Sequence, residues 1–170
     1  MSRYSRSETK GYIDKAQNAT KNALWSIERA YMPPREGAPA AFILLSCLID
    51  FLGTLYAGKK STPDRFKAFV SDFIKQEYRG VGYDPEKLWT SLRNKLVHNY
   101  SLGEYILAHN HPALHLTPRG GATILNLENF FHDVQQAADD YFARVAQETA
   151  LQDKLSERIY KDGTIEDVQV

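Results

Sequence analysis

Cysteine is nearly absent from this sequence, because Cys47 is the single one among its 170 residues. One cysteine cannot form an intramolecular disulfide and cannot supply a cysteine-rich zinc site. The beginning of the sequence has no apolar stretch of the kind that a secretory signal requires. We therefore expect a protein of the reducing cytoplasm, and we expect no metal and no other cofactor.

An excess of charge of either sign is absent as well. The 21 Lys and Arg residues balance the 21 Asp and Glu residues, so the formal net charge is zero. Proteins that bind phosphate backbones regardless of base sequence usually carry a strong positive charge. Any contact with RNA is therefore expected to be local. One candidate patch for such a contact consists of four basic residues, Lys59, Lys60, Arg65 and Lys67. A solvated helix edge is, however, the more frequent meaning of such a cluster.

Long apolar runs are missing too, with one exception between Ala40 and Ala57. This segment is nearly long enough to span a bilayer, but Asp50 interrupts it near its middle. A helix that is apolar on nearly all sides is more often the buried centre of a bundle, or part of a dimer interface, than a membrane anchor. We therefore predict a buried helix here and no association with a membrane.

The sequence as a whole predicts one helical domain over residues 1–160 and a flexible acidic tail over residues 161–170. Apolar residues recur at three- and four-residue steps on both sides of the apolar run. They predict a first helix from about Ser7 to the stop at Pro33. A third helix begins near Thr62, with Pro63 in its first turn, and ends around Tyr78 to Gly82. A fourth begins at Asp84.

Between Gly103 and Asn126 the apolar spacing changes to two, which is typical of strands. Turn sequences divide this stretch into short segments, so we predict a small two- or three-stranded β-meander. A final long helix is expected from about Glu128, continuing toward Ile159. The predicted fold class is mainly α, a bundle of about five helices with a small β-meander inserted before the last helix.

The fourth helix carries the candidate site. In α-helical geometry Asn94 and His98, four residues apart, are neighbours on a face that lies away from the apolar stripe around Leu92. Arg93 is rotated from His98 by about 140° and needs its long side chain to reach the imidazole. We predict that the three groups converge on one exposed site.

These three groups suit the cleavage of RNA without a metal. An imidazole can move protons near neutral pH. A guanidinium can donate two fixed hydrogen bonds to phosphate oxygens as charge builds in the transition state. One histidine cannot be acid and base at once, so a second copy of the chain around a two-fold axis would supply the other imidazole and a second arginine. The prediction is a homodimer with a composite site.

The order of Arg93, Asn94, three further residues and His98 on a helix late in the chain resembles the motif of the HEPN superfamily. That motif consists of an arginine, a polar residue, a short spacer and a histidine. The resemblance implies an HEPN-like helical bundle that dimerises and cleaves single-stranded RNA as a metal-independent endoribonuclease, in a toxin or antiviral defence system. It also implies catalytic roles for Arg93 and His98, with Asn94 in support.

Tyr100 adds a second point of resemblance. In one branch of the HEPN superfamily, a tyrosine two residues beyond the histidine receives AMP from a partner nucleotidyltransferase that acts as antitoxin. The resemblance therefore implies Tyr100 as a modification site and a nucleotidyltransferase as a partner. By the α-helical count Tyr100 also falls near the apolar stripe, so a core or interface tyrosine is the alternative.

Each residue of the candidate site also has a structural interpretation. His98 could contact the terminal carbonyls at a helix end, and Arg93 could form a surface salt bridge. Asp50, inside the apolar helix, either supports the site by orienting Arg93 or His98, or pairs with some other buried donor.

A second group of histidines lies in the predicted β-segment. His109, His111 and His115 share parity on a candidate strand, which is one arrangement that metal ligands adopt. Pro112 interrupts the strand, however, and no carboxylate accompanies the three rings. We therefore do not expect a metal site there.

The sequence leaves two functions open. One is the homodimeric HEPN ribonuclease described above. The other is a catalytically silent helical module with the same fold that binds a nucleotide or a partner protein, which the neutral net charge favours. Loss of RNA cleavage in His98→Ala separates the two hypotheses.

Overall fold

A computed structural model describes residues 4–32, 38–58, 60–99 and 103–162 of the chain. Most of the proline-rich loop before the second helix lies outside the described residues, as do Lys59, Tyr100 and residues 163–170 of the predicted acidic tail. The predictions for Tyr100 and for the tail therefore stay predictions.

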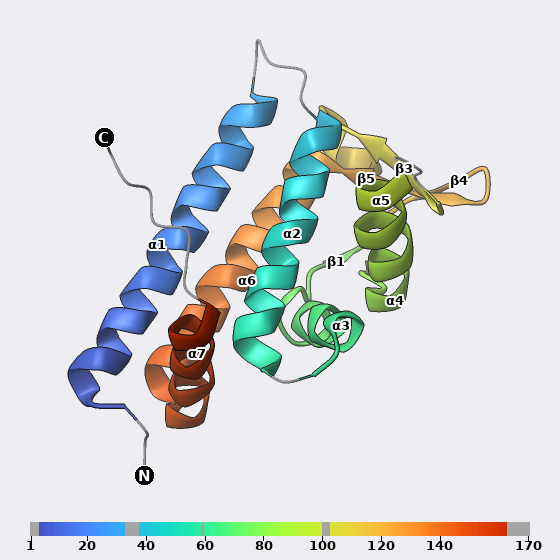
Figure 1. Ribbon diagram of the computed structural model, residues 1–170. Helices are drawn as coiled ribbons and strands as arrows, with labels where there is room; N and C mark the ends of the chain where they lie inside the picture. The colour runs from blue at the N-terminus through green and yellow to red at the C-terminus, as the bar shows by residue number, and fades with distance from the viewer. Residues whose placement is uncertain (1–3, 33–37, 59, 100–102, 163–170) are drawn as a thin grey trace.

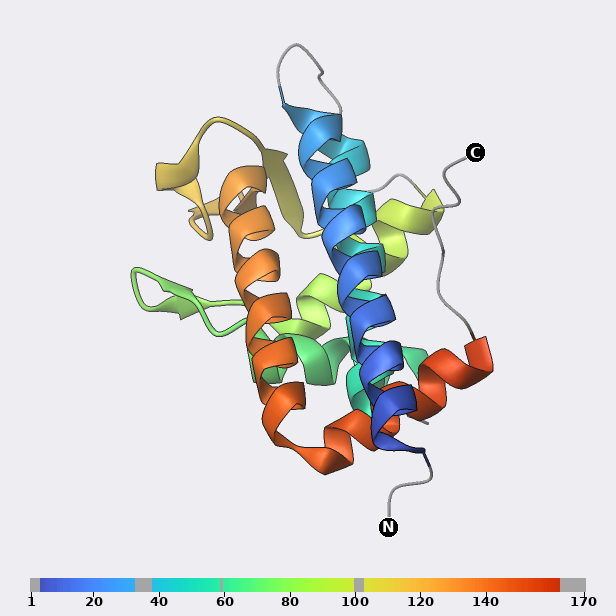
Figure 2. The same ribbon diagram turned by 90° about the vertical axis from the view of Figure 1, so that its left-hand side faces the viewer.

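The described part of the chain is mainly α-helical, as predicted. Three long helices lie side by side (Figures 1 and 2): α1 (Arg6–Tyr31), α2 (Ala38–Ala57) and α6 (Leu127–Gln147). The shorter α3 (Thr62–Phe73) packs mainly on α2, and α7 (Thr149–Asp162) packs on α1, α2 and α6 near one end of the bundle. The predicted single final helix is interrupted at Glu148, so its two parts are the separate helices α6 and α7.

Local sequence signals account for the beginnings of these helices. Ser5 forms a capping box with Glu8, in which each side chain binds the backbone N–H of the other residue. Pro63 stands in the first turn of α3, where its missing N–H costs nothing. The third helix is nevertheless shorter than predicted. It ends at Phe73, and a small antiparallel hairpin of β1 (Glu77–Tyr78) and β2 (Val81–Gly82) replaces its expected last turn.

The apolar helix α2 forms the centre of the bundle, as predicted. It contacts α1, α3, α6 and α7, and several of its side chains are fully buried: Ala41, Phe42, Leu45, Ile49 and Leu52. By length and composition, α2 is also the one helix among the described residues that could cross a membrane. Half of its apolar window is buried inside the protein, which is how a core helix behaves.

A small sheet precedes α6, as predicted, but its strands do not pair as a meander. It contains β3 (Tyr105–Ala108), β4 (Pro118–Arg119) and β5 (Ala122–Asn126) in the order β3-β5-β4. The strand β5 pairs with β3 in parallel and with β4 antiparallel. The chain between β3 and β4 includes a 3₁₀ turn, η2 (Pro112–Leu114), and this detour lets β5 take the central place.

The candidate site lies on one helical column between the hairpin and the sheet (Figure 1). The column begins with α4 (Pro85–Lys87), continues as η1 (Leu88–Leu96) and ends with α5 (Val97–Asn99). Its middle part, η1, is a π-helix rather than an α-helix. The column contacts α2 and α3, and buries Leu88, Ser91, Leu92 and Leu96.

Candidate functional site

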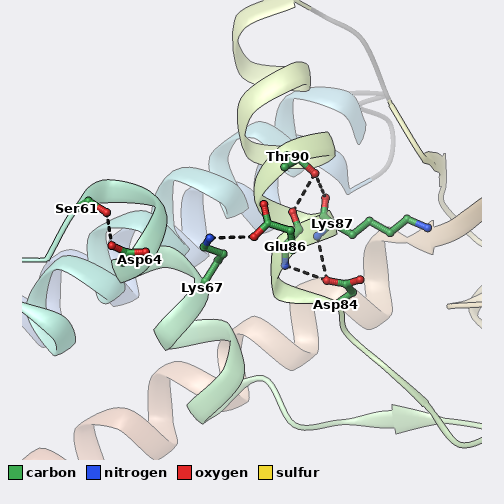
Figure 3. A network of polar contacts seen from close by, with 7 residues as sticks. All are labelled: Ser61, Asp64, Lys67, Asp84, Glu86, Lys87 and Thr90. Atoms are coloured by element: carbon green, nitrogen blue, oxygen red, sulfur yellow. Dashed lines mark hydrogen bonds and ion pairs between the residues drawn. The ribbon is translucent and has the colours of Figure 1, made fainter.

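Polar contacts anchor the beginning of the helical column. The Asp84 carboxylate accepts hydrogen bonds from the backbone N–H groups of Glu86 and Lys87, at 2.9 and 3.1 Å, and so caps α4. The Lys67 ammonium lies 2.9 Å from the Glu86 carboxylate and links α3 to α4 (Figure 3). The helix that carries the candidate residues is therefore capped at its first turn and tied to its neighbour.

These contacts bear on the predicted basic patch. Lys67 is paired with Glu86, and Arg65 donates a hydrogen bond to the Thr62 hydroxyl at 3.0 Å. Lys60 is exposed. The described members of the cluster therefore include two residues with protein partners, which matches a solvated helix edge better than a surface that binds RNA.

The π-helical register of η1 changes the geometry that the sequence predicts for the site. In a π-helix the backbone hydrogen bonds join residues five apart, so residues i and i+5 come nearly above one another. Arg93 and His98 have this spacing, and Nη1 of Arg93 lies 3.2 Å from Nε2 of His98. The segment is π-helical rather than α-helical, and Arg93 reaches His98 with its long side chain, as predicted. Asn94 is exposed, and the partner of the imidazole is Arg93.

Asp50 of α2 holds the other edge of the Arg93 guanidinium. Its Oδ2 accepts hydrogen bonds from Nε at 3.1 Å and from Nη2 at 2.7 Å, across 43 residues of sequence. The side chains are only 15% exposed for Asp50 and 19% for Arg93. Among the structural alternatives, a surface salt bridge of Arg93 does not fit, because the pair is largely buried. Asp50 is the carboxylate that orients Arg93.

Trp89 completes the support of the guanidinium. The Arg93 guanidinium carbon lies 5.3 Å from the centroid of the Trp89 ring, within the range of a cation–π contact. The same ring packs edge-on against Phe66 of α3, at 5.5 Å between centroids. Trp89 stands four residues before Arg93, a spacing at which side chains of one helix meet.

His98 is exposed at the end of the column, and its contact with Arg93 restricts its protonation state. A guanidinium has only donors, so Nε2 of His98 accepts this hydrogen bond. The ring in this arrangement is neutral and carries its proton on Nδ1. Nε2 carries no proton in this arrangement. A hydroxyl that displaces Arg93 from Nε2 can therefore give its proton to this nitrogen, while the guanidinium remains close by.

The surface of α2 beside the pair is apolar. Leu44 is 43% exposed, and Cys47 is exposed as well. One helical turn further, Phe51 is half-buried on the same face. Both Arg93 and Asp50 act electrostatically on the Cys47 thiol, which places it close to the ion pair. An apolar strip of Leu44, Cys47 and Phe51 therefore borders the candidate site.

The three histidines of the β-segment do not form a site. His109 and His111 are exposed, whereas His115 is 2% exposed. The 3₁₀ turn η2 separates them and breaks the parity on which the metal interpretation depended. The described residues contain no group of three or more His, Cys, Asp or Glu side chains arranged to hold a metal ion.

His115 instead belongs to a buried polar network that the sequence did not reveal. Its Nδ1 accepts the Asn126 backbone N–H at 3.0 Å, so its Nε2 carries the proton and donates to the Tyr83 hydroxyl at 2.8 Å. The Tyr83 hydroxyl donates in turn to Asp133, at 2.6 Å, and the Tyr78 hydroxyl donates to the same carboxylate, at 2.8 Å. The network connects the hairpin, the sheet and α6.

Burial lowers the pKa of His115 to about 4, although the nearby Asp133 carboxylate opposes this shift. Burial and the hydrogen bond to Asp133 raise the pKa of Tyr78 to about 12. These groups keep one protonation state near neutral pH, so they suit a structural role rather than proton transfer. The candidate site is therefore the cluster of Arg93, His98 and Asp50.

Comparisons with protein-family models, curated proteins and solved structures found no match for this chain.

Proposed function

We propose that this protein is a metal-independent endoribonuclease of HEPN type that cleaves single-stranded RNA at a site shared by two copies of the chain. The observation that carries the proposal is the contact between the Arg93 guanidinium and the exposed His98 imidazole, with Asp50 behind it. Asn94 is exposed next to Arg93 and is the supporting polar residue of the motif. We further propose a cytoplasmic role as a toxin or an antiviral defence component, with a nucleotidyltransferase antitoxin as partner.

The proposed reaction is a transesterification within the RNA. The 2′-oxygen attacks the adjacent phosphorus while the neutral His98 imidazole accepts the 2′-hydroxyl proton at Nε2. The bond from phosphorus to the 5′-oxygen breaks, and a protonated imidazole supplies the proton to this leaving oxygen. The products are a 2′,3′-cyclic phosphate and a 5′-hydroxyl. Arg93 stabilises the charge on the phosphate oxygens, because its guanidinium is held in place before the RNA binds.

One His98 cannot accept and donate a proton in the same step, so the second imidazole comes from a second copy. The apolar strip of Leu44, Cys47 and Phe51 borders the ion pair and supports a contact at this face. Exposed apolar side chains that adjoin a polar site are a frequent feature of homodimer interfaces. Sedimentation of the purified protein at micromolar concentration is expected to give a dimer, and a monomer would argue against the composite site.

The decisive experiment measures cleavage of a single-stranded RNA in EDTA. We expect the wild-type protein to cleave and both His98→Ala and Arg93→Ala to lose at least about 100-fold in rate. His109→Ala is a matched control, because His109 is an exposed histidine away from the cluster and should leave the rate unchanged. Equal cleavage by wild type and His98→Ala would rule out the catalytic assignment.

One observation favours the second function, a silent module that binds a nucleotide or a partner protein. The Asp50 carboxylate neutralises Arg93, so the cluster stabilises the extra charge of a transition state less than an unpaired arginine does, which favours a binding role over a catalytic one. If the wild-type protein does not cleave RNA, calorimetric titration with AMP and ATP tests this alternative. Binding that Arg93→Ala abolishes would support it.

A further inference from the structure

The contact of Arg93 with His98 depends on the hydrogen-bonding register of η1. In an α-helix two residues five apart are rotated by about 140° from one another. Arg93 lies inside the π-helical segment Leu88–Leu96 and His98 lies just after it in α5, so the wider turns of η1 reduce this rotation. Most π-helices are single-turn bulges inside α-helices, and they are frequent at functional sites. A nine-residue π-helix therefore needs contacts that stabilise it against the α-helical alternative.

The turn after the column supplies such contacts. Gly103 lies directly against the middle of η1, so that a Cβ atom added to it would lie 2.7 Å from Oγ and 2.8 Å from Cβ of Ser91. The same Cβ would lie 3.1 Å from Cδ of Lys95. Ser91 is itself 1% exposed, so it has no room to move away. Gly103 also has a φ of 55°, a conformation that glycine adopts without strain.

Hydrogen bonds fix this turn on both sides. The Glu104 backbone N–H donates to Oγ of Ser91 at 3.3 Å, which ties the turn to η1. The Glu104 carbonyl accepts the Thr123 backbone N–H at 2.9 Å, which ties the turn to β5. The Lys87 ammonium donates to the Thr123 hydroxyl at 2.7 Å and so joins the start of the column to the same strand. The sheet therefore holds Gly103 against η1.

We propose that Gly103 and Ser91 are positioning residues whose contact holds η1 in the π-helical register in which Arg93 meets His98. Neither residue touches the substrate in the proposed reaction. They act through the helix, because a return of η1 to the α-helical register would rotate Arg93 further from the imidazole and weaken their contact. The inference rests on the proposed function only where it concerns catalysis, since the register and the side-chain contact exist independently of any RNA.

The first test compares Gly103→Ala with Gly120→Ala. Both glycines have a similar positive φ, 55° and 59°, so alanine adds the same backbone strain at either position. Only Gly103 has neighbours that the new methyl group would meet, because a Cβ at Gly120 has nothing within 4 Å. Gly120→Ala is therefore the control for strain without contact.

The readout that requires no catalysis is the nitrogen spectrum of the His98 ring. Arg93→Lys is expected to shift these signals in the wild-type protein and in Gly120→Ala, and to leave them unchanged in Gly103→Ala. In the cleavage assay, Gly103→Ala is expected to lower kcat by about 100-fold with little change in KM. Equal responses of His98 in the two alanine variants would overturn the proposal. If no variant cleaves RNA but the spectra differ as expected, the proposed function fails and the register inference stands.

A second test uses two one-residue deletions, and if Gly103→Ala does not fold it tests the dependence on register without which Gly103 and Ser91 could not act as positioning residues. Deletion of Lys95, which is exposed, shortens the spacing from Arg93 to His98 to four, and an α-helix brings such residues together. Deletion of Thr90 leaves the spacing at five, which an α-helix separates. The Arg93-dependent shift of His98 is expected to survive the first deletion and to vanish in the second. Its survival in the Thr90 deletion would contradict the proposed role of the register.

Discussion

Replacing Asp50 by asparagine tests the ion pair that supports the candidate site. Both hydrogen bonds from Arg93 end on Oδ2 of Asp50, at 3.1 and 2.7 Å. An asparagine oxygen can still accept them, so Asp50→Asn removes the charge and keeps the shape. Arg93 stays charged in this variant, so its hydrogen bonds remain, but a largely buried guanidinium loses its counter-ion. Removal of one partner of a fully buried ion pair costs about 3 to 5 kcal/mol, and a pair that is partly exposed and keeps its hydrogen bonds costs less. We therefore expect the free energy of unfolding to fall by about 2 kcal/mol.

Burial is the reason to expect an effect of this size. The side chains of the pair are 15% and 19% exposed, whereas exposed ion pairs contribute less than about 1 kcal/mol. The pair between Arg144 and Glu148 has a similarly short separation, 2.6 Å, but its side chains are 44% and 42% exposed. Glu148→Gln is thus a matched control, for which we expect a loss below about 0.5 kcal/mol.

Urea unfolding followed by circular dichroism measures both variants, with the free energy extrapolated to water. A double-mutant cycle of Asp50→Asn with Arg93→Gln should give a coupling of at least about 1 kcal/mol. If Asp50→Asn and Glu148→Gln destabilise the protein equally, or if the cycle shows no coupling, the reasoning from burial is refuted. In the cleavage assay the same Asp50→Asn protein should lose rate, because Arg93 is no longer held by a charge.

Two further predictions concern the fold. Gly53→Ala should destabilise the protein by about 2 kcal/mol, because the added Cβ would lie 2.7 Å from the Arg65 carbonyl oxygen. Gly11→Ala should stabilise α1 by about 0.5 to 1 kcal/mol, because a Cβ at Gly11 has open space around it. Thermal melting compares the two variants. His115 binds a proton in the unfolded chain below its ordinary pKa of 6.5, but in the folded protein only below about 4. Stability should therefore fall by about 2 to 3 kcal/mol as the pH drops through this window and should not depend on His115 above it. Urea unfolding at several pH values checks this, and a His115→Gln protein with the same pH dependence as wild type would contradict it.

The helix beginnings and the central position of α2 could be predicted because their causes are local. The capping box of Ser5 and Glu8 and the proline in the first turn of α3 act within a few residues. The composition of α2 leaves it few stable places other than a core, and Leu45 and Ile49 are fully buried there. The end of α3 was not predictable in the same way, because the hairpin that follows it contacts the distant Asp133 through Tyr78.

The residues of the candidate site and the approach of Arg93 to His98 were predicted, but the helical register between them was not. Leu88, Leu92 and Leu96 repeat every four residues, which indicates a helix without revealing its hydrogen-bonding register. Arg93 lies in the π-helical segment and contacts both His98 and Trp89, and contacts from Gly103 accompany this segment. In the β-segment, Pro112 had already indicated an interruption of the strand, and a 3₁₀ turn stands there.

By itself, the sequence determined where the helices begin, which of them is buried, and which helix carries an arginine and a histidine. Those properties follow from side-chain polarity and from hydrogen bonds between near neighbours in the chain. Only the tertiary structure decided which of the alternatives for Asp50 holds, by placing it on Arg93, and which helical register separates Arg93 from His98. The physical reason is that the Asp50 contact joins residues 43 positions apart, and that the apolar spacing of a helix does not reveal its hydrogen-bonding register.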